Sequence, residues 1–236
     1  MEGTLAVFEA LDKHAAVQEV FVSEDHPDSA TLAAEAAAAG ASVVTASHGV
    51  LEALSETTTP QGVVAVLQME DIVPSDMTVT SGLVLVLDQI RDPGNAGTLV
   101  RCATAAGADA VFFTQGSVDP YSPKTVRSAA GALFRMEFGH DLPFERIAEE
   151  LSSRDFAIVG TDAAAEKPYD SLDCTGRIAF VVGNEAWGIS EEHRPRLDEL
   201  VSIPMPGDAE SLNAGIAGAI LLFEAVRQRR ISSATK

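Results

Sequence analysis

The sequence predicts an α/β protein with parallel sheets, built from two domains. Stretches with a helical repeat of apolar residues alternate along the chain with short apolar stretches typical of strands, and this alternation favours parallel sheets. The stretch 70–81 is polar, contains a proline and shows no clear period, which is typical of a linker. We therefore expect a small α/β domain at residues 1–70, a linker at 71–81 and a larger domain at 82–236.

The elements expected in the first domain are short. An alanine-rich stretch predicts a helix that ends at Gly40, because glycine commonly terminates helices. The same periodicity predicts helices at 4–11, 29–39 and 49–54, and strands at 19–22, 42–45 and 62–68.

The second domain opens on the uninterrupted apolar run 83–87, which is typical of a strand buried on both faces. The turn 91–95 leads into a helix that runs to about Ala106 and stops at Gly107. The remaining pattern predicts strands at 110–114, 157–160, 178–182 and 200–203, and helices at 123–134 and 144–153.

A final helix is predicted over residues 212–230. Three of its last four residues are arginines, which suit the negative carboxyl end of a helix dipole. One face carries apolar residues at helical spacing, namely Leu212, Ile216, Ile220 and Phe223.

The composition is that of an ordinary globular protein, with 46% hydrophobic and 22% charged residues. Its apolar runs are far shorter than the ~20 residues of a membrane helix, and we expect no signal peptide because a basic and then an apolar region are missing at the start. Cys102 and Cys174 have neither disulfide-framework nor zinc-ligand spacing. These observations predict a cytoplasmic protein without a membrane partner.

The net charge is strongly negative, −19, from 16 Lys plus Arg against 35 Asp plus Glu. The charge is also uneven, because residues 1–80 hold 13 acidic groups and a single basic one. Such a chain repels polyanions at long range, so non-specific nucleic-acid binding is disfavoured.

Several common catalytic signatures are missing from the sequence. There is no GxGxxG after a strand, no P-loop and no GxSxG elbow. The five histidines are scattered without ligand spacing, so we expect no metal site. The residues alone therefore predict a ligand site in the loops at the strand ends, with its chemistry open.

Three segments of the second domain carry a resemblance to a known family. They are LDQIRDPGNAGTLVR at 87–101, VVGNEAWG at 181–188, and IPMPG at 203–207 followed by ESLN at 210–213. In this order and spacing they resemble the three motifs of the SpoU (TrmH-like) branch of SPOUT methyltransferases. The first domain, which ends in QGVVA at 61–65, resembles the small substrate-binding domain that many members carry in front.

The resemblance implies a SPOUT-type parallel-sheet domain with a trefoil knot at its carboxyl end, a rare topology. It also implies a ribose 2′-O-methyltransferase of ribosomal or transfer RNA that uses S-adenosylmethionine, and a homodimer whose site draws on both chains. Two alternatives stay open. One is an antibiotic-resistance rRNA methyltransferase of the same fold, and the other is a non-catalytic relative that binds cofactor or RNA.

Five residues match the catalytic positions of the family: Asn95, Arg101, Glu185, Ser211 and Asn213. Arginine is a poor proton acceptor, so we favour Arg101 as a clamp on a phosphate beside the target ribose, where it stabilises charge on the 2′ oxygen. Asn95 orients its loop, contacts the ribose or caps a helix. Glu185 accepts hydrogen bonds from Arg101 or substrate, or is a solvated carboxylate, and Ser211 is either a site residue or a helix cap.

The resemblance also implies a cofactor pocket around the adenosine, formed by Thr161, Gly183, Ile203, Met205 and Leu212. Glycine at position 183 suits a backbone that approaches a ligand closely, although a plain turn favours glycine as well.

Three further residues keep two or more interpretations. Trp187, the only tryptophan, stacks on a base, covers the pocket or packs in the core. Arg127 and Arg135 lie in a segment that resembles one beside the family's active site, where they either contact RNA or form surface ion pairs.

The acidic first domain departs from the resemblance, which implies that this domain helps to hold RNA. Three explanations stay open. Positive charge is clustered at the catalytic cleft, or the protein works at high salt, where the Debye length falls to ~3 Å at 1 M, or the RNA role has been lost.

Overall fold

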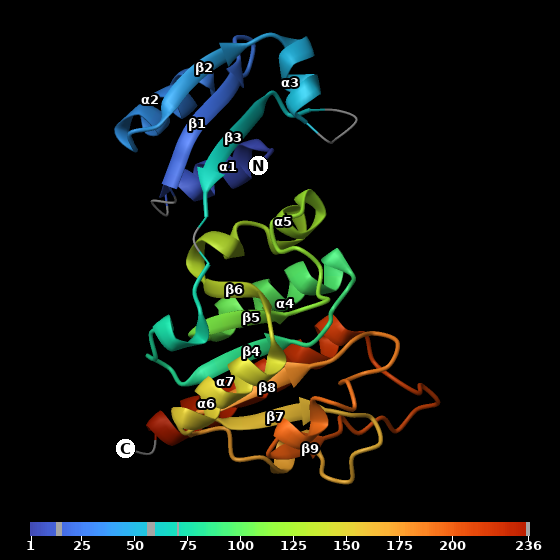
Figure 1. Cartoon of the computed structure of the whole chain (residues 1–236). Coiled ribbons are helices and arrows are strands. Elements are labelled where there is room, and N and C mark those ends of the chain that lie inside the picture. The colour runs from blue at the N-terminus through green and yellow to red at the C-terminus, as the bar shows by residue number, and fades with distance from the viewer. Residues whose placement is uncertain (13–15, 56–59, 70, 235–236) are drawn as a thin grey trace. The chain divides into compact units, whose positions relative to one another are not determined.

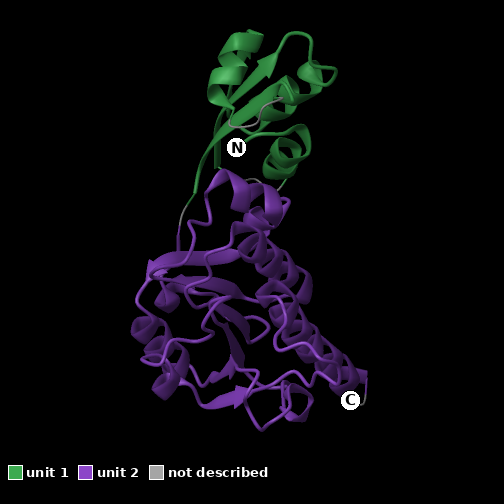
Figure 2. Cartoon of the chain, turned by 90° about the vertical axis from the view of Figure 1, so that its right-hand side faces the viewer, with its two compact units in different colours: residues 1–70 green, residues 71–236 purple. Residues whose placement is uncertain are grey.

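The computed structural model describes residues 1–12, 16–55, 60–69 and 71–234. Its contacts divide the chain into two compact units, Met1–Glu70 and Asp71–Lys236 (Figure 2). Each unit has a sheet of its own.

In its described residues, the first unit is a small sheet with three helices, α1 (Thr4–Asp12), α2 (Ser29–Ala38) and α3 (His48–Leu54) (Figure 1). In the sheet, β1 (Ala16–Ser23) lies between β2 (Ser42–Ala46) and β3 (Val63–Gln68). β1 pairs in parallel with β2 and antiparallel with β3. The expected parallel sheet is therefore a mixed one here, because α2 returns the chain to run beside β1 in the same direction whereas β3 enters from the opposite end.

The second unit is a six-stranded sheet in which every neighbouring pair is parallel, in the order β6-β5-β4-β8-β7-β9. This confirms the predicted parallel α/β class. The strands are β4 (Leu83–Leu87), β5 (Ala110–Thr114), β6 (Glu137–Leu142), β7 (Ala157–Thr161), β8 (Ile178–Val182) and β9 (Glu199–Val201). The helices are α4 (Pro93–Ala106), α5 (Pro123–Ala129), α6 (Phe144–Ser153) and α7 (Ala214–Ala234), with 3-10 turns η1 (Pro74–Asp76), η2 (Ala132–Arg135), η3 (Tyr169–Ser171) and η4 (Arg194–Arg196).

The core of the second unit lies on both faces of the central strands. All residues of β4 and β8 are buried, as their uninterrupted apolar runs predict. Val84 and Val86 of β4 share one core cluster with Ile147 of α6. On the opposite face, Val182 of β8 lies against α7. Both faces of the sheet are therefore covered by helices, which leaves the strand ends as the place for a site.

Two elements differ from the sequence pattern. β6 is not predicted, because Glu137, His140 and Asp141 are polar and the strand lies at the sheet edge, where its pairing shifts register and Asp141 has φ 53°. The single helix predicted over 123–134 is broken, because Ala130 and Gly131 adopt left-handed backbone angles of φ 45° and φ 75°.

The stretch 71–81 is not a free linker but part of the second unit. Met77 is only 3% exposed and belongs to the core cluster beside α6, and the amide of Ile72 donates to the carbonyl of Phe138 at 3.0 Å. Arg154, at the end of α6, donates to the carbonyl of Met77 at 2.8 Å and to that of Ser75. The linker prediction is wrong because a few apolar residues and one arginine anchor a stretch whose average composition is polar.

The C-terminal helix α7 packs through its small residues. A side-chain carbon added at Gly218 would lie 2.3 Å from Leu99 Cδ2 of α4, so the two helices are in close contact. Leu221 and Leu222 are buried as well, whereas Ile216 is 53% and Phe223 47% exposed. The apolar face that the sequence marks on this helix is thus the outward one.

The C-cap of α4 offers a test of the expectation that glycine is favoured where the backbone adopts a positive φ. Gly107 adopts φ 70° at the helix C-cap and has open space around its Cα. Gly107→Ala is therefore expected to destabilise the second unit by about 1 kcal/mol through backbone strain alone, measured by chemical denaturation. Gly176→Ala is the matched control, because Gly176 also has open space and has no positive φ. Equal stability of the two variants would contradict the prediction.

Candidate functional site

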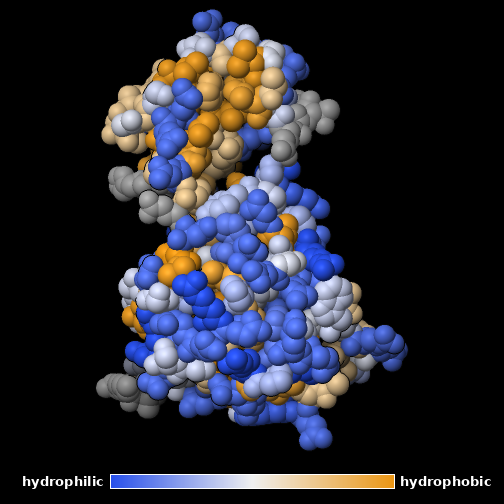
Figure 3. Space-filling model, in the orientation of Figure 1, coloured by the Kyte–Doolittle hydropathy of each residue, from blue (hydrophilic) through white to orange (hydrophobic). Residues whose placement is uncertain are grey.

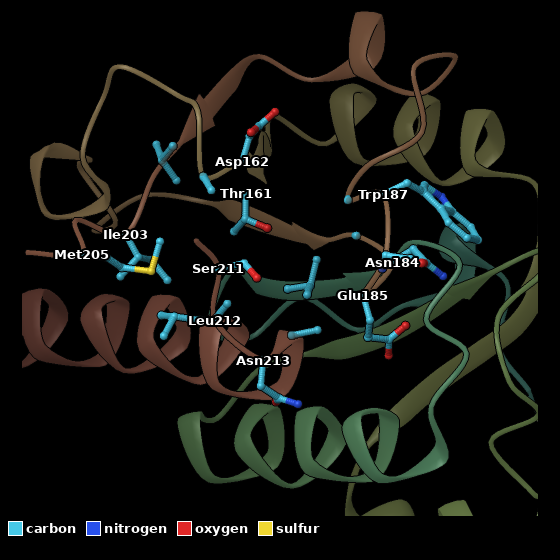
Figure 4. A pocket seen from close by; sticks show the side chains of 18 of the residues that line it. Thr161, Asp162, Asn184, Glu185, Trp187, Ile203, Met205, Ser211, Leu212 and Asn213 are labelled. Carbon is cyan, nitrogen blue, oxygen red and sulfur yellow. Dashed lines mark hydrogen bonds between the residues drawn. The ribbon is translucent and has the colours of Figure 1, made fainter. Parts of the chain in front are cut away.

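The site lies at the carboxyl ends of the sheet strands, where parallel α/β proteins bind ligands. A pocket of about 470 Å³ opens there (Figure 4). Its walls come from four chain segments that are distant in sequence: the loops after β7, β8 and β9, and the start of α7. The lining residues are Thr161, Asp162, Ala163, Val182, Gly183, Asn184, Glu185, Ala186, Trp187, Gly188, Arg194, Val201, Ile203, Met205, Ser211, Leu212, Asn213, Ala214 and Ala217.

The pocket has an apolar end and a polar end. In Figure 4, Ile203, Met205 and Leu212 lie together on one side, whereas Asn184, Glu185 and Trp187 lie on the other. All five residues expected at the cofactor line the pocket: Thr161, Gly183, Ile203, Met205 and Leu212. Three of the five residues expected in catalysis line it as well, namely Glu185, Ser211 and Asn213.

Gly183 is required by the protein's own backbone. A side-chain carbon at this position would lie 2.3 Å from the carbonyl carbon of Gly188 and from the amide nitrogen of Ile189. Asn184 and Gly188 exchange backbone hydrogen bonds of 2.9 Å, which closes the loop after β8 tightly. The close approach that demands glycine is therefore an approach of this loop to itself.

A chain of three side chains joins the three motifs. Asn95 Nδ2 donates to Glu185 Oε1 at 2.9 Å, and Asn213 Nδ2 donates to Asn95 Oδ1 at 2.8 Å. Glu185 accepts, in addition, from the backbone amides of Arg91 at 3.4 Å and Asp92 at 3.3 Å. The hydrogen bond from Arg101 to Glu185 that the sequence left open is thus replaced by contacts from the loop before α4.

The helix caps fall to other residues than those considered from the sequence. Asp92 caps α4, because its Oδ1 accepts from the amide of Asn95 at 2.8 Å. Asn213 caps α7, because its Oδ1 accepts from the amide of Ile216 at 3.2 Å. The side-chain amide of Asn95 therefore binds Glu185 instead of capping a helix, and Ser211 is exposed in the pocket wall.

Arg101 stands apart from the pocket. It lies on α4, is exposed to solvent, and makes no hydrogen bond or ion pair within the parts of the chain that the structure describes. Its six-residue separation from Asn95 corresponds to about 9 Å along a helix axis. The guanidinium is thus available to a ligand outside the pocket.

Two features of the site escaped the sequence argument. Asn184, 5% exposed, donates to the carbonyl of Gln89 at 2.6 Å and so ties the loop after β8 to the loop after β4. Asp162 pairs with Arg194 at 2.6 Å in the pocket wall. The pKa of Asp162 is lowered by the hydrogen bond from the Ala164 amide and by Arg194. The signal that could have identified Asn184 is its position directly after a buried strand and Gly183.

A buried polar cluster supports the site from behind. Asp88 is completely buried at the end of β4, and its Oδ1 lies 2.9 Å from His193 Nδ1 and accepts from Thr114 Oγ1 at 3.2 Å. Its Oδ2 accepts from the amide of Ser190 at 3.3 Å. The ring of His193 stacks on Phe144 at 4.4 Å. The cluster fixes the loop after β8 to the central strand.

The described residues contain neither a metal centre nor a membrane-spanning helix. Among the described residues, no three His, Cys, Asp or Glu side chains are placed to hold a metal ion. No helix in the described part of the chain is both long and apolar enough to cross a membrane.

These observations define a parallel α/β protein whose three sequence motifs are joined by hydrogen bonds beside one pocket. The family model for the SpoU rRNA Methylase family matches residues 82–223, and the model for RNA 2′-O ribose methyltransferase substrate binding matches residues 1–72. The chain belongs to the SpoU rRNA methylase family, which confirms the resemblance.

Two relatives and one solved structure are similar over almost the whole chain. The 23S rRNA (guanosine(2553)-2′-O)-methyltransferase RlmP of Bacillus subtilis is 34% identical over 94% of this chain and 86% of that protein. The 23S rRNA (guanosine-2′-O-)-methyltransferase RlmB of Bordetella pertussis is 33% identical over 91% and 90%. The SpoU methyltransferase AviRb from Streptomyces viridochromogenes, in complex with the cofactor AdoMet, superposes with a TM-score of 0.88 at 29% identity, covering 98% of this chain and 89% of that one.

Proposed function

We propose that the protein is an S-adenosylmethionine-dependent RNA methyltransferase that modifies a ribose 2′-hydroxyl. The observation that carries this proposal is the hydrogen-bonded chain of Glu185, Asn95 and Asn213, which joins all three family motifs beside one pocket. In a non-catalytic relative, this intact set of polar groups and the unpaired Arg101 on α4 would serve no function.

The pocket fits S-adenosylmethionine in size and polarity. A volume of about 470 Å³ lies in the range of small-molecule sites. Ile203, Met205 and Leu212 offer apolar contacts to the adenine, and Thr161 and Gly183 complete the adenosine site that we assign. When bound, this cofactor supplies a methyl group attached to a positively charged sulfur, which is reactive without a metal.

Glu185 and the two asparagines act by positioning. Both carboxylate oxygens of Glu185 already accept hydrogen bonds from the loop before α4, so we assign Glu185 the task of holding that loop at the pocket. Asn95 is fixed at both ends of its amide by Glu185 and Asn213. This rigidity suits a reaction in which the attacking oxygen has to be aligned with the methyl group at roughly 3–3.5 Å.

Arg101 is the residue that we assign to the substrate. Its charge is permanent and its guanidinium matches a phosphate in two hydrogen bonds. On the exposed side of α4 it is placed to clamp the phosphate beside the target ribose and to stabilise charge that develops on the 2′ oxygen. Ser211, exposed in the pocket wall, is assigned to the ligand rather than to a helix cap.

Clustered positive charge explains how so acidic a chain meets RNA. Residues 91–135 hold five basic and three acidic groups, although the whole chain carries −19. They include α4, the buried strand β5, α5 and η2, and α5 packs on the start of α4, where Ser128 Oγ donates to the carbonyl of Gly94 at 3.1 Å. We therefore propose this surface, with Arg101, Arg127 and Lys124, as the RNA-facing side of the second unit.

Ribosomal RNA is the substrate that we propose, with guanosine as the target. The support comes from the two relatives described above, both named as 23S rRNA guanosine 2′-O-methyltransferases and both similar over at least nine-tenths of this chain.

The deciding experiment is methyl transfer from labelled S-adenosylmethionine to unmodified 23S rRNA, 16S rRNA and transfer RNA transcripts at low and high salt. We expect label in 23S rRNA, recovered as 2′-O-methylguanosine after digestion. Label in transfer RNA alone would overturn the substrate. Folded protein that binds the cofactor and labels none of the RNAs at any salt concentration would overturn the activity.

We also propose that the protein is a homodimer formed through the outward face of α7. Ile216 and Phe223 of α7 are about half exposed, and Leu212, two residues before the helix begins, is 36% exposed. Large apolar side chains gathered on one helix face mark an interaction surface, and this face adjoins the pocket through Leu212. A second copy seated here would border the site.

The dimer is tested by placing a charge on that face. Phe223→Glu is expected to be a monomer at a protein concentration at which the wild type is a dimer, because a carboxylate buried without a partner is costly. Sedimentation velocity distinguishes the two states. Leu5→Glu is the control, because Leu5 is an exposed apolar residue, 82%, on α1 of the other unit. A wild-type monomer, or a dimer that survives Phe223→Glu, would contradict the proposal.

The trefoil knot is a further proposal. β9 lies at the edge of the sheet beside β7, whereas α7, which follows it, contacts α4 and the central strand β8. The segment 202–213 therefore returns across the carboxyl ends of the strands (Figure 1). This return supports the threaded topology that the family resemblance implies.

The cytoplasm is the compartment that we propose. The RNA substrate resides there, and Cys102 and Cys174 are both free thiols. Burial raises the pKa of Cys174 to about 11, so this thiol stays protonated and unreactive at neutral pH. Free thiols of this kind suit a reducing compartment.

A further inference from the structure

Trp187 is a large aromatic side chain that the assignments above leave unused. It is the only tryptophan of the chain, is 48% exposed, and lies two residues after Glu185 in the tight loop that follows β8. The guanidinium of Arg91 lies over its ring, with the carbon Cζ 4.9 Å from the ring centroid. An exposed indole in a pocket wall offers a flat apolar face to a ligand.

The position of the indole favours a base of the RNA over the adenine of the cofactor. In Figure 4, Trp187 lies at the opposite end of the pocket from Ile203 and Met205, and its ring points away from them. Glu185 lies on the Trp187 side of the pocket, two residues before the indole in the sequence. The apolar end is the part assigned above to the adenine, so the indole at the other end is left for a second flat ligand.

Arg91 gives a second reason to expect an RNA base at Trp187. It belongs to the loop before α4, and its amide donates to Glu185 Oε2 at 3.4 Å, so the Arg91–Trp187 pair is tied to the hydrogen-bonded chain that positions the reaction. A guanidinium covers one face of an indole and leaves the other for one ring. Proteins recognise unpaired RNA bases by stacking them on such aromatic and guanidinium planes.

We propose that Trp187, backed by Arg91, is the platform on which the base of the target nucleotide stacks when its ribose enters the site. This inference rests on the proposed RNA methyl transfer and names the group that holds the unstacked nucleotide. A base held there, with Arg101 on the neighbouring phosphate, fixes the nucleotide at two points around its 2′-hydroxyl.

The single tryptophan makes the test direct, because intrinsic fluorescence excited at long wavelength reports on Trp187 alone. The probes are a single-stranded RNA 12-mer of mixed sequence, the same 12-mer made entirely of abasic ribose phosphates, and S-adenosylhomocysteine. We expect strong quenching by the RNA, little by the abasic strand, and little by S-adenosylhomocysteine. Equal quenching by both strands would assign the contact to phosphate and overturn the proposal. Quenching by S-adenosylhomocysteine with no further change on adding RNA would assign Trp187 to the cofactor, and an unchanged signal throughout would also overturn it.

Steady-state kinetics give the second readout. Trp187→Ala is expected to raise KM for 23S rRNA by ~10-fold to ~100-fold and to leave the Kd for S-adenosylmethionine unchanged, whereas Trp187→Phe retains a flat ring and restores most of the loss. A raised cofactor Kd, or a Phe variant as poor as the Ala variant, would contradict the stacking role. Because the fluorescence titration needs no turnover, it separates failure of the platform from failure of the methyltransferase assignment.

Discussion

Replacing Arg101 with alanine is expected to lower kcat for RNA methyl transfer by at least ~100-fold, the loss typical of removing one donor to a developing oxyanion. The affinity for S-adenosylmethionine is expected to stay unchanged, because Arg101 is outside the pocket lining. Its guanidinium is exposed on α4, and its removal breaks no hydrogen bond or ion pair among the described residues. The effect should therefore fall on the chemical step and on RNA binding.

Two measurements isolate that effect. Single-turnover methylation at saturating RNA gives the chemical rate, and isothermal titration gives the cofactor affinity. Arg146→Ala is a suitable control, since Arg146 is an exposed helix residue on α6. Lost cofactor binding together with normal activity per bound site would remove Arg101 from the role assigned here. Arg101→Lys should recover only part of the rate, because lysine lacks the planar pair of donors.

Replacing Asp88 with alanine is expected to destabilise the second unit by about 3–5 kcal/mol, the usual effect of removing one partner from a buried polar pair. Asp88 is completely buried, and its carboxylate faces the imidazole of His193, the hydroxyl of Thr114 and the amide of Ser190. Alanine leaves these groups facing an empty space without an acceptor.

Guanidinium denaturation followed by tryptophan fluorescence measures this loss, because the only tryptophan lies in the same unit. Asp208→Ala is the control, as Asp208 is exposed in the loop before α7. A destabilisation below about 1 kcal/mol, the size of an ordinary hydrogen bond, would mean that the cluster does not hold the site together.

The fold was predictable where each strand consists of apolar residues alone. β4 and β8 occur at the residues expected, because burial on both faces leaves an uninterrupted apolar run. β6 was not predictable, because an edge strand tolerates Glu137 and Asp141. The apolar residues marked on α7 in the sequence were a misleading guide to its packing, because they lie on its outward face. The helix packs through glycines of its other face, such as Gly218, which allow a closer approach than leucine or isoleucine.

The site was predictable as a set of segments, whereas its contacts were not. Parallel strands place the ends of β4 and β8 side by side, so the motifs that follow them had to meet. The partner of Glu185 depended on the direction of its side chain, which points toward Asn95 rather than Arg101. Gly183 illustrates the same limit, because a glycine needed by a ligand and one needed by the chain itself are identical in sequence.

The hydrogen bonds that join the motifs have a consequence for the order in which the protein is made. Asn95 and Glu185 are 90 residues apart, and Asn95 and Asn213 are 118 apart. Contacts of such long range form late in folding, because the entropy of closing large loops has to be overcome first. A chain still being synthesised lacks the third partner until Asn213 has been added. The methyl-transfer site is therefore expected to appear only after that segment has left the ribosome, so that a chain that stops before it is inactive toward RNA.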